Sequence, residues 1–135
     1  MKAEQNKRLK REYKDSSRPL GVFLIRNATN NKVFLASGLD LNGTINRHRY
    51  QLSHGSHFNQ QLQADWNDLG TDKFEFEIVE QLEPQRDSSF DSRKELEFME
   101  RIWLERLRPF GEHGYNQPRL SRSQKLRRIA GKSTD

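Results

Sequence analysis

Two residues capable of acid–base or metal chemistry lie beside apolar helix faces. His48 falls on the apolar face of one predicted helix, and Glu100 follows Met99 at the edge of another such face. A histidine can exchange a proton near neutral pH, and a carboxylate holds a hard cation through its oxygens. Each also has an ordinary explanation: a satisfied core histidine, and an exposed helix glutamate that pairs with lysine or arginine. Residue type and spacing alone leave both explanations open.

The elements that must position these residues begin with a predicted β-hairpin at residues 21–38. Two short apolar runs, 22–25 and 33–36, flank a polar cluster that contains Asn30 and Asn31. Asparagine tolerates the positive φ values of a tight turn, so this pattern is typical of two antiparallel strands and their connection.

The sequence of the two hairpin strands also predicts their position within the sheet. Because both runs are apolar throughout, we expect both strands at the centre of the sheet rather than at its edge. An unbulged hairpin with a connection of even length would place Phe23 and Phe34 on the same face, whereas an odd connection would separate them.

Three helices and one further strand follow. Asp40 is a plausible N-cap, and Gly55 and Gly70 mark two helix ends. We expect the apolar face of the second helix to include Phe58. The predicted order is therefore β-β-α-α-β-α, a small α+β domain with a three-stranded antiparallel sheet flanked by three helices. The expected helices span residues 41–53, 58–69 and 92–107, and the expected third strand, with one solvated face, spans residues 73–79.

Charge divides the chain into three parts. Residues 1–18 carry a net charge of +4, residues 119–135 carry +5, and residues 19–118 carry −4. We therefore expect a basic N-terminal arm (1–19), a folded domain (20–118) and a basic C-terminal tail (119–135). Basic arms indicate a polyanionic partner, most simply nucleic acid. The alternative is that both arms are solvated termini without a partner.

Composition excludes several classes of protein. The chain has no cysteine, so it has no disulfide framework and no thiolate metal site. No apolar run approaches the roughly 18 residues of a membrane span, and the N-terminus has no apolar leader. From these features we expect a cytoplasmic protein without a membrane partner. Only 32% of the residues are hydrophobic, so the small core must rely on its eight Phe and two Trp.

An ordered set of short motifs resembles the GIY-YIG nucleases. Gly21-Val22-Phe23 and Phe34-Leu35-Ala36, with ten residues between them, look like a weakened form of the paired signature that names the family. The resemblance covers roughly residues 20–118 and is closest to the small bacterial branch found alone or attached to transcriptional regulators. The further matching fragments are Asn46-Arg47-His48, Gly55-Ser56-His57, Phe74-Glu75-Phe76-Glu77-Ile78, Glu100 before Trp103, and Gly114-Tyr115-Asn116.

The resemblance implies metal-dependent phosphodiester hydrolysis. Glu100 matches the family's metal-binding glutamate, which would hold Mg²⁺ weakly, if at all, in this chain. Asn116 matches the closing asparagine that positions groups within the site, although a loop-capping asparagine would look the same. His48 matches a recurrent family histidine. His57 matches another, although its place at a helix start is explained by capping alone.

The same resemblance, together with the charge pattern, predicts which residues contact nucleic acid. Arg47 stands at a basic position of the family, and Arg49 and His57 lie close to it in sequence. DNA is the expected partner. The arm residues expected to contact it are Lys7, Arg8, Lys10, Arg11, Arg122, Lys125, Arg127 and Arg128.

Four substitutions separate this chain from the family pattern. Phe23 and Phe34 replace both signature tyrosines, and a phenyl ring can neither accept a proton nor hold a water. Ala36 replaces the second signature glycine. Eight residues further, Thr44 occupies the position of the catalytic arginine, and Arg47 one helical turn later already matches another basic position. Losing an oxyanion donor costs about 10²–10³ in rate, and losing general-base help about 10²–10⁴.

Three functions remain possible on sequence alone. The first is a degenerate nuclease domain that binds DNA and has lost efficient cleavage. The second is an active Mg²⁺-dependent endonuclease that uses Arg47, His48 and water in altered roles. The third is a structural component of a ribonucleoprotein or protein assembly. Phe23, Phe34 and Thr44 favour the first over the second, whereas the basic arms do not separate the first from the third.

Overall fold

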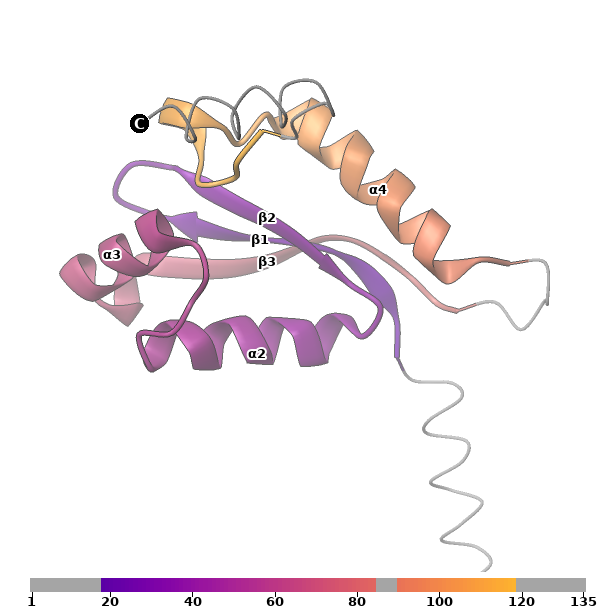
Figure 1. Ribbon diagram of the computed structural model, residues 1–135, viewed down its shortest axis with the longest axis horizontal. Helices are drawn as coiled ribbons and strands as arrows, with labels where there is room; N and C mark the ends of the chain where they lie inside the picture. The colour runs from indigo at the N-terminus through magenta and orange to yellow at the C-terminus, as the bar shows by residue number, and fades with distance from the viewer. Residues whose placement is uncertain (1–17, 85–89, 119–135) are drawn as a thin grey trace, which may run out of the picture.

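A three-stranded antiparallel sheet in the order β2-β1-β3 lies between two layers of helices (Figure 1). The computed structural model describes residues 18–84 and 90–118, and it confirms the predicted α+β class and element order. Helices α2 and α3 cover one face of the sheet, and α4 covers the other. The elements are β1 (Leu20–Asn27), β2 (Val33–Gly38), α2 (Leu41–Ser53), α3 (Gln60–Leu69), η1 (Thr71–Lys73), β3 (Phe74–Leu82), α4 (Ser92–Leu107) and η2 (Gly111–His113).

The hairpin has the register that puts both signature positions on one face. Phe23 lies opposite Ala36, and Ile25 lies opposite Phe34. Since side chains two residues apart on a strand share a face, Phe23 and Phe34 both point toward α2 and α3. Asn31 has φ 63°, the left-handed conformation that the turn requires and that asparagine tolerates.

Two separate cores account for strands that are apolar on both faces. One joins Phe23, Ile25 and Phe34 to the apolar sides of α2 and α3. The other joins Val22 and Leu24 to the apolar side of α4. On the helix sides that face the sheet, Leu41, Leu52, Leu62, Trp66 and Met99 are all buried.

The expectation that both hairpin strands are central is correct only for β1. β2 is an edge strand, and residues 114–116 cover its outer edge. The N–H of Tyr115 donates to the carbonyl of Val33 (2.9 Å). The side-chain amide of Asn116 both accepts from and donates to the backbone of Leu35 (2.8 Å each). The apolar pattern of a strand reports which of its faces are covered and carries no information about its backbone edges.

The start of α3 corrects a second expectation. The predicted helix began at residue 58, but the cap is Asn59, whose side chain accepts the N–H of Leu62 (3.0 Å). Because an N-cap residue has extended backbone, the chain before it leaves the helical path. Phe58 therefore does not join the buried face of α3, and its side chain is 70% exposed.

Tyr115 anchors the segment that covers β2. Its hydroxyl donates to Asp65 (2.7 Å) and accepts from Asn27 (3.0 Å), which ties the C-terminal segment to α3 and β1. Burial raises the pKa of Tyr115 to about 12, so the hydroxyl keeps its proton. Gly114 passes too close to Val33 for a side chain, since a Cβ there would lie 2.5 Å from that carbonyl oxygen. No helix among the described residues is long and apolar enough to cross a membrane.

Candidate functional site

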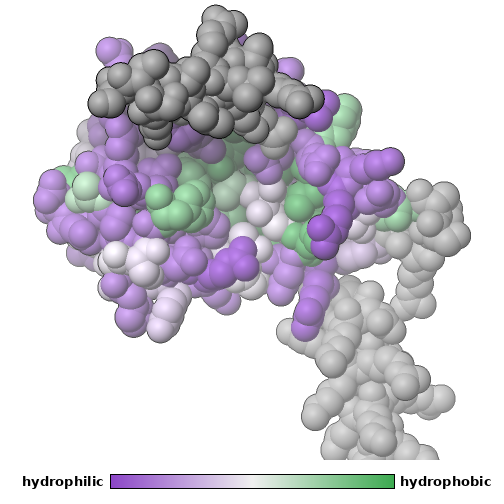
Figure 2. Space-filling view, viewed as in Figure 1, coloured by the Kyte–Doolittle hydropathy of each residue, from purple (hydrophilic) through white to green (hydrophobic). Residues whose placement is uncertain are grey.

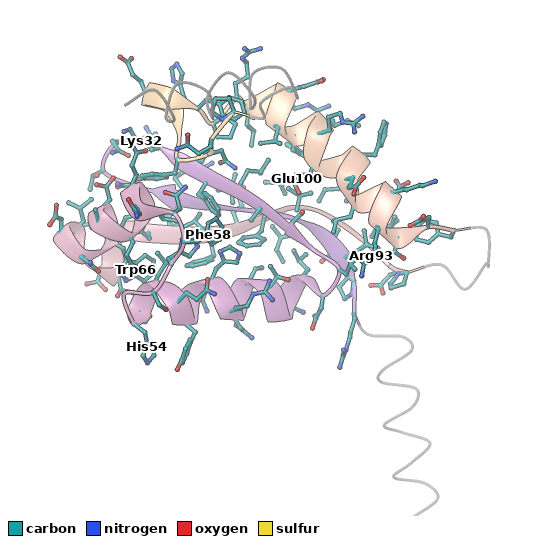
Figure 3. The ribbon with its side chains drawn as sticks, in the orientation of Figure 1. Lys32, His54, Phe58, Trp66, Arg93 and Glu100 are labelled. Atoms are coloured by element: carbon teal, nitrogen blue, oxygen red, sulfur yellow. The ribbon has the colours of Figure 1, made fainter. Side chains whose placement is uncertain are left out.

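A groove of about 600 Å³ runs along the covered edge of the sheet. Residues 34–37 of β2 form its floor, and its walls come from His48, residues 58–61, Glu100 and residues 116–117. Figure 3 shows Glu100 on α4 and Phe58 ahead of α3, on opposite sides of the sheet. Figure 2, in the same orientation as Figure 1, shows a mostly hydrophilic surface, with apolar residues gathered between α4 on one side and α2 and α3 on the other. The groove thus collects residues that are far apart in sequence.

Three residues predicted from the sequence meet in this groove. His48 reaches it from α2, Glu100 from α4 and Asn116 from the C-terminal segment. Phe34 and Ala36, the second signature triplet, lie in its floor. These three residues therefore lie at one place in the structure, beside the edge strand β2.

Phe23 and Thr44 do not line the groove. Phe23 has no exposed surface and packs edge-on against the ring of His48, with ring centroids 5.3 Å apart. Thr44 is buried against Gly38, where an added Cβ would lie only 2.0 Å from the Thr44 hydroxyl oxygen. That hydroxyl donates to the carbonyl of Asp40 (2.8 Å) within the first turn of α2. Thr44 therefore has a packing and helix-terminal role in this structure.

His48 and His57 form a hydrogen-bonded pair. Nδ1 of His48 and Nε2 of His57 are 2.8 Å apart, and Nδ1 of His57 accepts the N–H of Asn59 (3.1 Å). Because that acceptor nitrogen carries no proton, the neutral His57 ring has its proton on Nε2 and donates it to His48. His48 in turn carries its proton on Nε2. His48 thus presents an N–H donor on the side of its ring away from His57.

Both rings of this pair are uncharged at neutral pH. Burial, the neighbouring His57 and the positive charge of Arg47 lower the pKa of His48 to about 4. Burial also lowers the pKa of His57. His57 is buried behind His48, so a direct contact with nucleic acid would require movement of neighbouring groups.

Of the residues that the structure describes, Glu100 is the only carboxylate that lines the groove. The hydroxyl of Ser37 donates a hydrogen bond to Glu100 Oε2. Among the described residues, no three His, Asp or Glu side chains are grouped so that they could hold a metal ion. The amide oxygen of Asn116 already accepts the N–H of Leu35. Mg²⁺ prefers several oxygen ligands in octahedral geometry, so this donor set does not fit a resident ion.

The predicted nucleic-acid contacts fall into two groups. Arg47 and Arg49 are exposed on α2, and the guanidinium of Arg49 lies over the ring of Phe76, 4.5 Å from its centroid. Neither arginine lines the groove. The arm residues Lys7, Arg8, Lys10, Arg11, Arg122, Lys125, Arg127 and Arg128 lie outside the described residues.

Several groove residues were missed by sequence reasoning. Ser37 contacts Glu100, Phe58 stands at the rim, and Gln60 and Gln61 add neutral amides. The sequence did contain one local signal for residues 58–61. Asn59 stands directly before a helical pattern, which makes it a strong N-cap candidate. Taking Asn59 as the cap would have placed Phe58 outside the helix. Nothing in the sequence indicates the contact of Ser37.

Comparison with known proteins identifies the same fold. No protein-family model matches this chain, and no curated protein sequence matches it. The catalytic domain of the intron endonuclease I-TevI, carrying one Glu-to-Ala substitution, matches with 26% identity and a TM-score of 0.61, over 76% of this chain and 97% of that one. The catalytic domain of homing endonuclease I-TevI matches with 28% identity and a TM-score of 0.60, over 74% and 99%. I-TevI is a GIY-YIG enzyme, so the resemblance predicted from the motifs is confirmed.

Proposed function

We propose that residues 20–118 form a GIY-YIG-like domain that binds nucleic acid, DNA in the first place, and has lost all or nearly all phosphodiesterase activity. One observation carries the proposal. The groove gathers Glu100, His48 and Asn116 at one place, but the lining that the structure describes has neither a tyrosine hydroxyl nor a guanidinium. It has the position of a hydrolytic site without two of the groups that the chemistry needs.

The residues present are poorly suited to phosphodiester hydrolysis. Phe34 offers the groove a ring without a hydroxyl, so a water in this part of the floor would find no side-chain proton acceptor there. The amide of Asn116 is held by the backbone of Leu35. The described residues of the lining include no arginine that could stabilise charge building on a phosphate. These features support binding without efficient cleavage.

Nucleic-acid binding is supported by charge and by structural similarity. The two terminal parts carry +4 and +5, against −4 for residues 19–118. Arg47 and Arg49 add exposed positive charge on α2. Both matching structures are catalytic domains of an endonuclease, a class of protein that acts on nucleic acid. Together these features favour a nucleic-acid partner over a purely structural role.

Cleavage and binding can be tested on the same preparation. Supercoiled, linear, branched and single-stranded DNA are incubated with the full chain and with Mg²⁺ or Mn²⁺, and binding is followed by fluorescence anisotropy. We expect binding together with nicking at background level, equal for the wild type and Glu100→Gln. Nicking by the wild type that Glu100→Gln abolishes would show an active endonuclease and overturn the proposed loss of activity.

Restoring the family groups gives a second test of the site. We expect Phe23→Tyr, Phe34→Tyr, Ala36→Gly and Thr44→Arg together to produce Mg²⁺-dependent nicking that a further Glu100→Ala removes. Phe23 and Thr44 are buried, so the combined variant must first be shown to fold by circular dichroism. The pair Phe34→Tyr and Ala36→Gly, confined to the groove floor, serves as the milder variant. Folded variants without any nicking would contradict the assignment of these positions.

A further inference from the structure

Phe58 is an exposed aromatic residue held in a fixed stack. Its ring lies on the ring of His57, with centroids 4.5 Å apart and planes at 22°. It also meets Phe34 (5.8 Å) and His48 (6.0 Å) edge-on. One side of Phe58 is thus packed against three rings, while 70% of the residue remains exposed at the rim of the groove.

The backbone on both sides of Phe58 is anchored. The N–H of His57 donates to the side chain of Gln63 (3.0 Å), and the side chain of Asn59 donates to the carbonyl of Tyr115 (2.7 Å). These bonds tie residues 57–59 to α3 and to the C-terminal segment. Phe58 is therefore a preorganised platform, since little conformational freedom is left to lose when a ligand covers it.

The polar groups around this platform are mostly neutral. Gln60, Gln61 and Gln117 line the groove with exposed amides, and His48 adds a neutral ring with an N–H donor. Among the described residues, no lysine or arginine lines the groove, and Glu100 is its one carboxylate. Primary amides pair with the edges of nucleobases, and aromatic rings stack on their faces. The lining therefore suits a base better than a phosphate.

We propose that this groove binds an unpaired nucleobase, stacked on Phe58 with its edge toward the amides of Gln60 and Gln61. The inference rests on the proposed nucleic-acid-binding function and specifies its ligand as a single-stranded or locally opened strand. A base within a duplex cannot place its face on Phe58, because both faces are already stacked. The sugar–phosphate backbone would remain outside the groove, in solvent.

The test compares Phe58→Ala with two matched aromatic substitutions elsewhere. Tyr50 on α2 (63% exposed) and Phe98 on α4 (55% exposed) lie outside the groove, so Tyr50→Ala and Phe98→Ala are the controls. Fluorescence anisotropy measures binding to labelled single-stranded DNA, single-stranded RNA and duplex DNA. Phe58→Trp retains an aromatic face and should keep the affinity.

We expect Phe58→Ala to weaken single-strand binding about 5- to 100-fold, the range of one lost base–aromatic stack, and to leave duplex binding within about twofold. Because no phosphate contact is lost, the dependence of affinity on salt should not change. The DNA and RNA arms show which single strand is preferred. Quenching of 2-aminopurine placed in the oligonucleotide, abolished by Phe58→Ala, would report the stack directly.

Several results would overturn this inference. These are equal loss for duplex and single strand, equal loss in the Tyr50→Ala control, or unchanged affinity in Phe58→Ala. Self-association that depends on Phe58 in sedimentation experiments would assign this surface to a second copy of the chain instead. Failure of the wild type to bind any of the three nucleic acids would instead overturn the proposed function itself, and the base site with it.

Discussion

His48 is both one half of a packed pair with His57 and part of the groove wall. Sequence reasoning left a satisfied core histidine and a functional histidine as alternatives. In the structure, one nitrogen of His48 is bonded to His57, while His48 still lines the groove. Burial keeps both rings neutral, so the pair supplies a hydrogen-bond donor and does not attract phosphate by charge.

The lowered pKa of His48 predicts a loss of stability in mild acid. The unfolded chain takes up a proton at His48 near pH 6.5, whereas the folded chain does so only near pH 4. Stability from neutral His48 is therefore fully present above about pH 6.5 and lost as the pH falls toward 4. His48→Gln, which can still accept from His57, should remove roughly 1–3 kcal/mol of this pH dependence. Urea unfolding at neutral and mildly acidic pH measures it, and identical profiles for both proteins would contradict the prediction.

At Leu35, the outer edge of β2 forms its hydrogen bonds with the side chain of Asn116 instead of with a fourth strand. Asn116 pairs with both backbone groups of Leu35, as a neighbouring strand would. This contact closes the strand beside the groove floor and fixes the C-terminal segment across the sheet edge. The asparagine that the family resemblance places in the site therefore has a clear structural role in this chain.

Removing this amide should loosen the edge strand. We expect Asn116→Ala to destabilise the domain by about 1–3 kcal/mol, because it leaves two backbone groups of β2 without their partner. The neighbouring Gln117→Ala, at an exposed groove residue, should change stability by less than about 0.5 kcal/mol. Hydrogen exchange locates the effect, since the amide of Leu35 should exchange faster only in Asn116→Ala. Unchanged protection of that amide would show that the pairing is not formed in solution.

Charge is distributed unevenly over the whole molecule. The folded domain is mildly acidic, and the excess positive charge lies in the terminal parts, outside the described residues apart from Arg18. A protein that binds nucleic acid through such arms relies on release of counterions from the phosphates. The described lining of the groove contains no lysine or arginine, so the groove and the arms would make different contributions to binding.

The salt dependence of binding should follow the arms. For duplex DNA, each neutralised phosphate adds a slope of about −0.9 in log K against log salt. Deleting residues 1–18 and 119–135 should flatten this slope and weaken binding, while circular dichroism shows an intact fold. A variant with the arm lysines and arginines replaced by glutamine separates charge from length. Equal affinity and slope before and after deletion would exclude the arms as the binding surface.

The sequence alone determined the helices and strands. It also identified some of the residues that line the groove. The apolar runs predicted the hairpin but left open whether Phe23 and Phe34 share a face, which only the observed register decided. Helical periodicity predicted the three helices but wrongly placed Phe58 on a buried face. The order of the motifs identified Glu100, His48 and Asn116, which the fold then brought to one groove.

Only the tertiary structure decided how those residues are used. Periodicity describes the faces of one element, whereas edges, pairings and exposure depend on segments far away in sequence. The amide of Asn116 is taken up by Leu35, 81 residues away in sequence. Thr44 is packed against Gly38, outside the groove. Phe58 is exposed because Asn59 caps α3 and bonds to Tyr115, a contact that no local pattern contains.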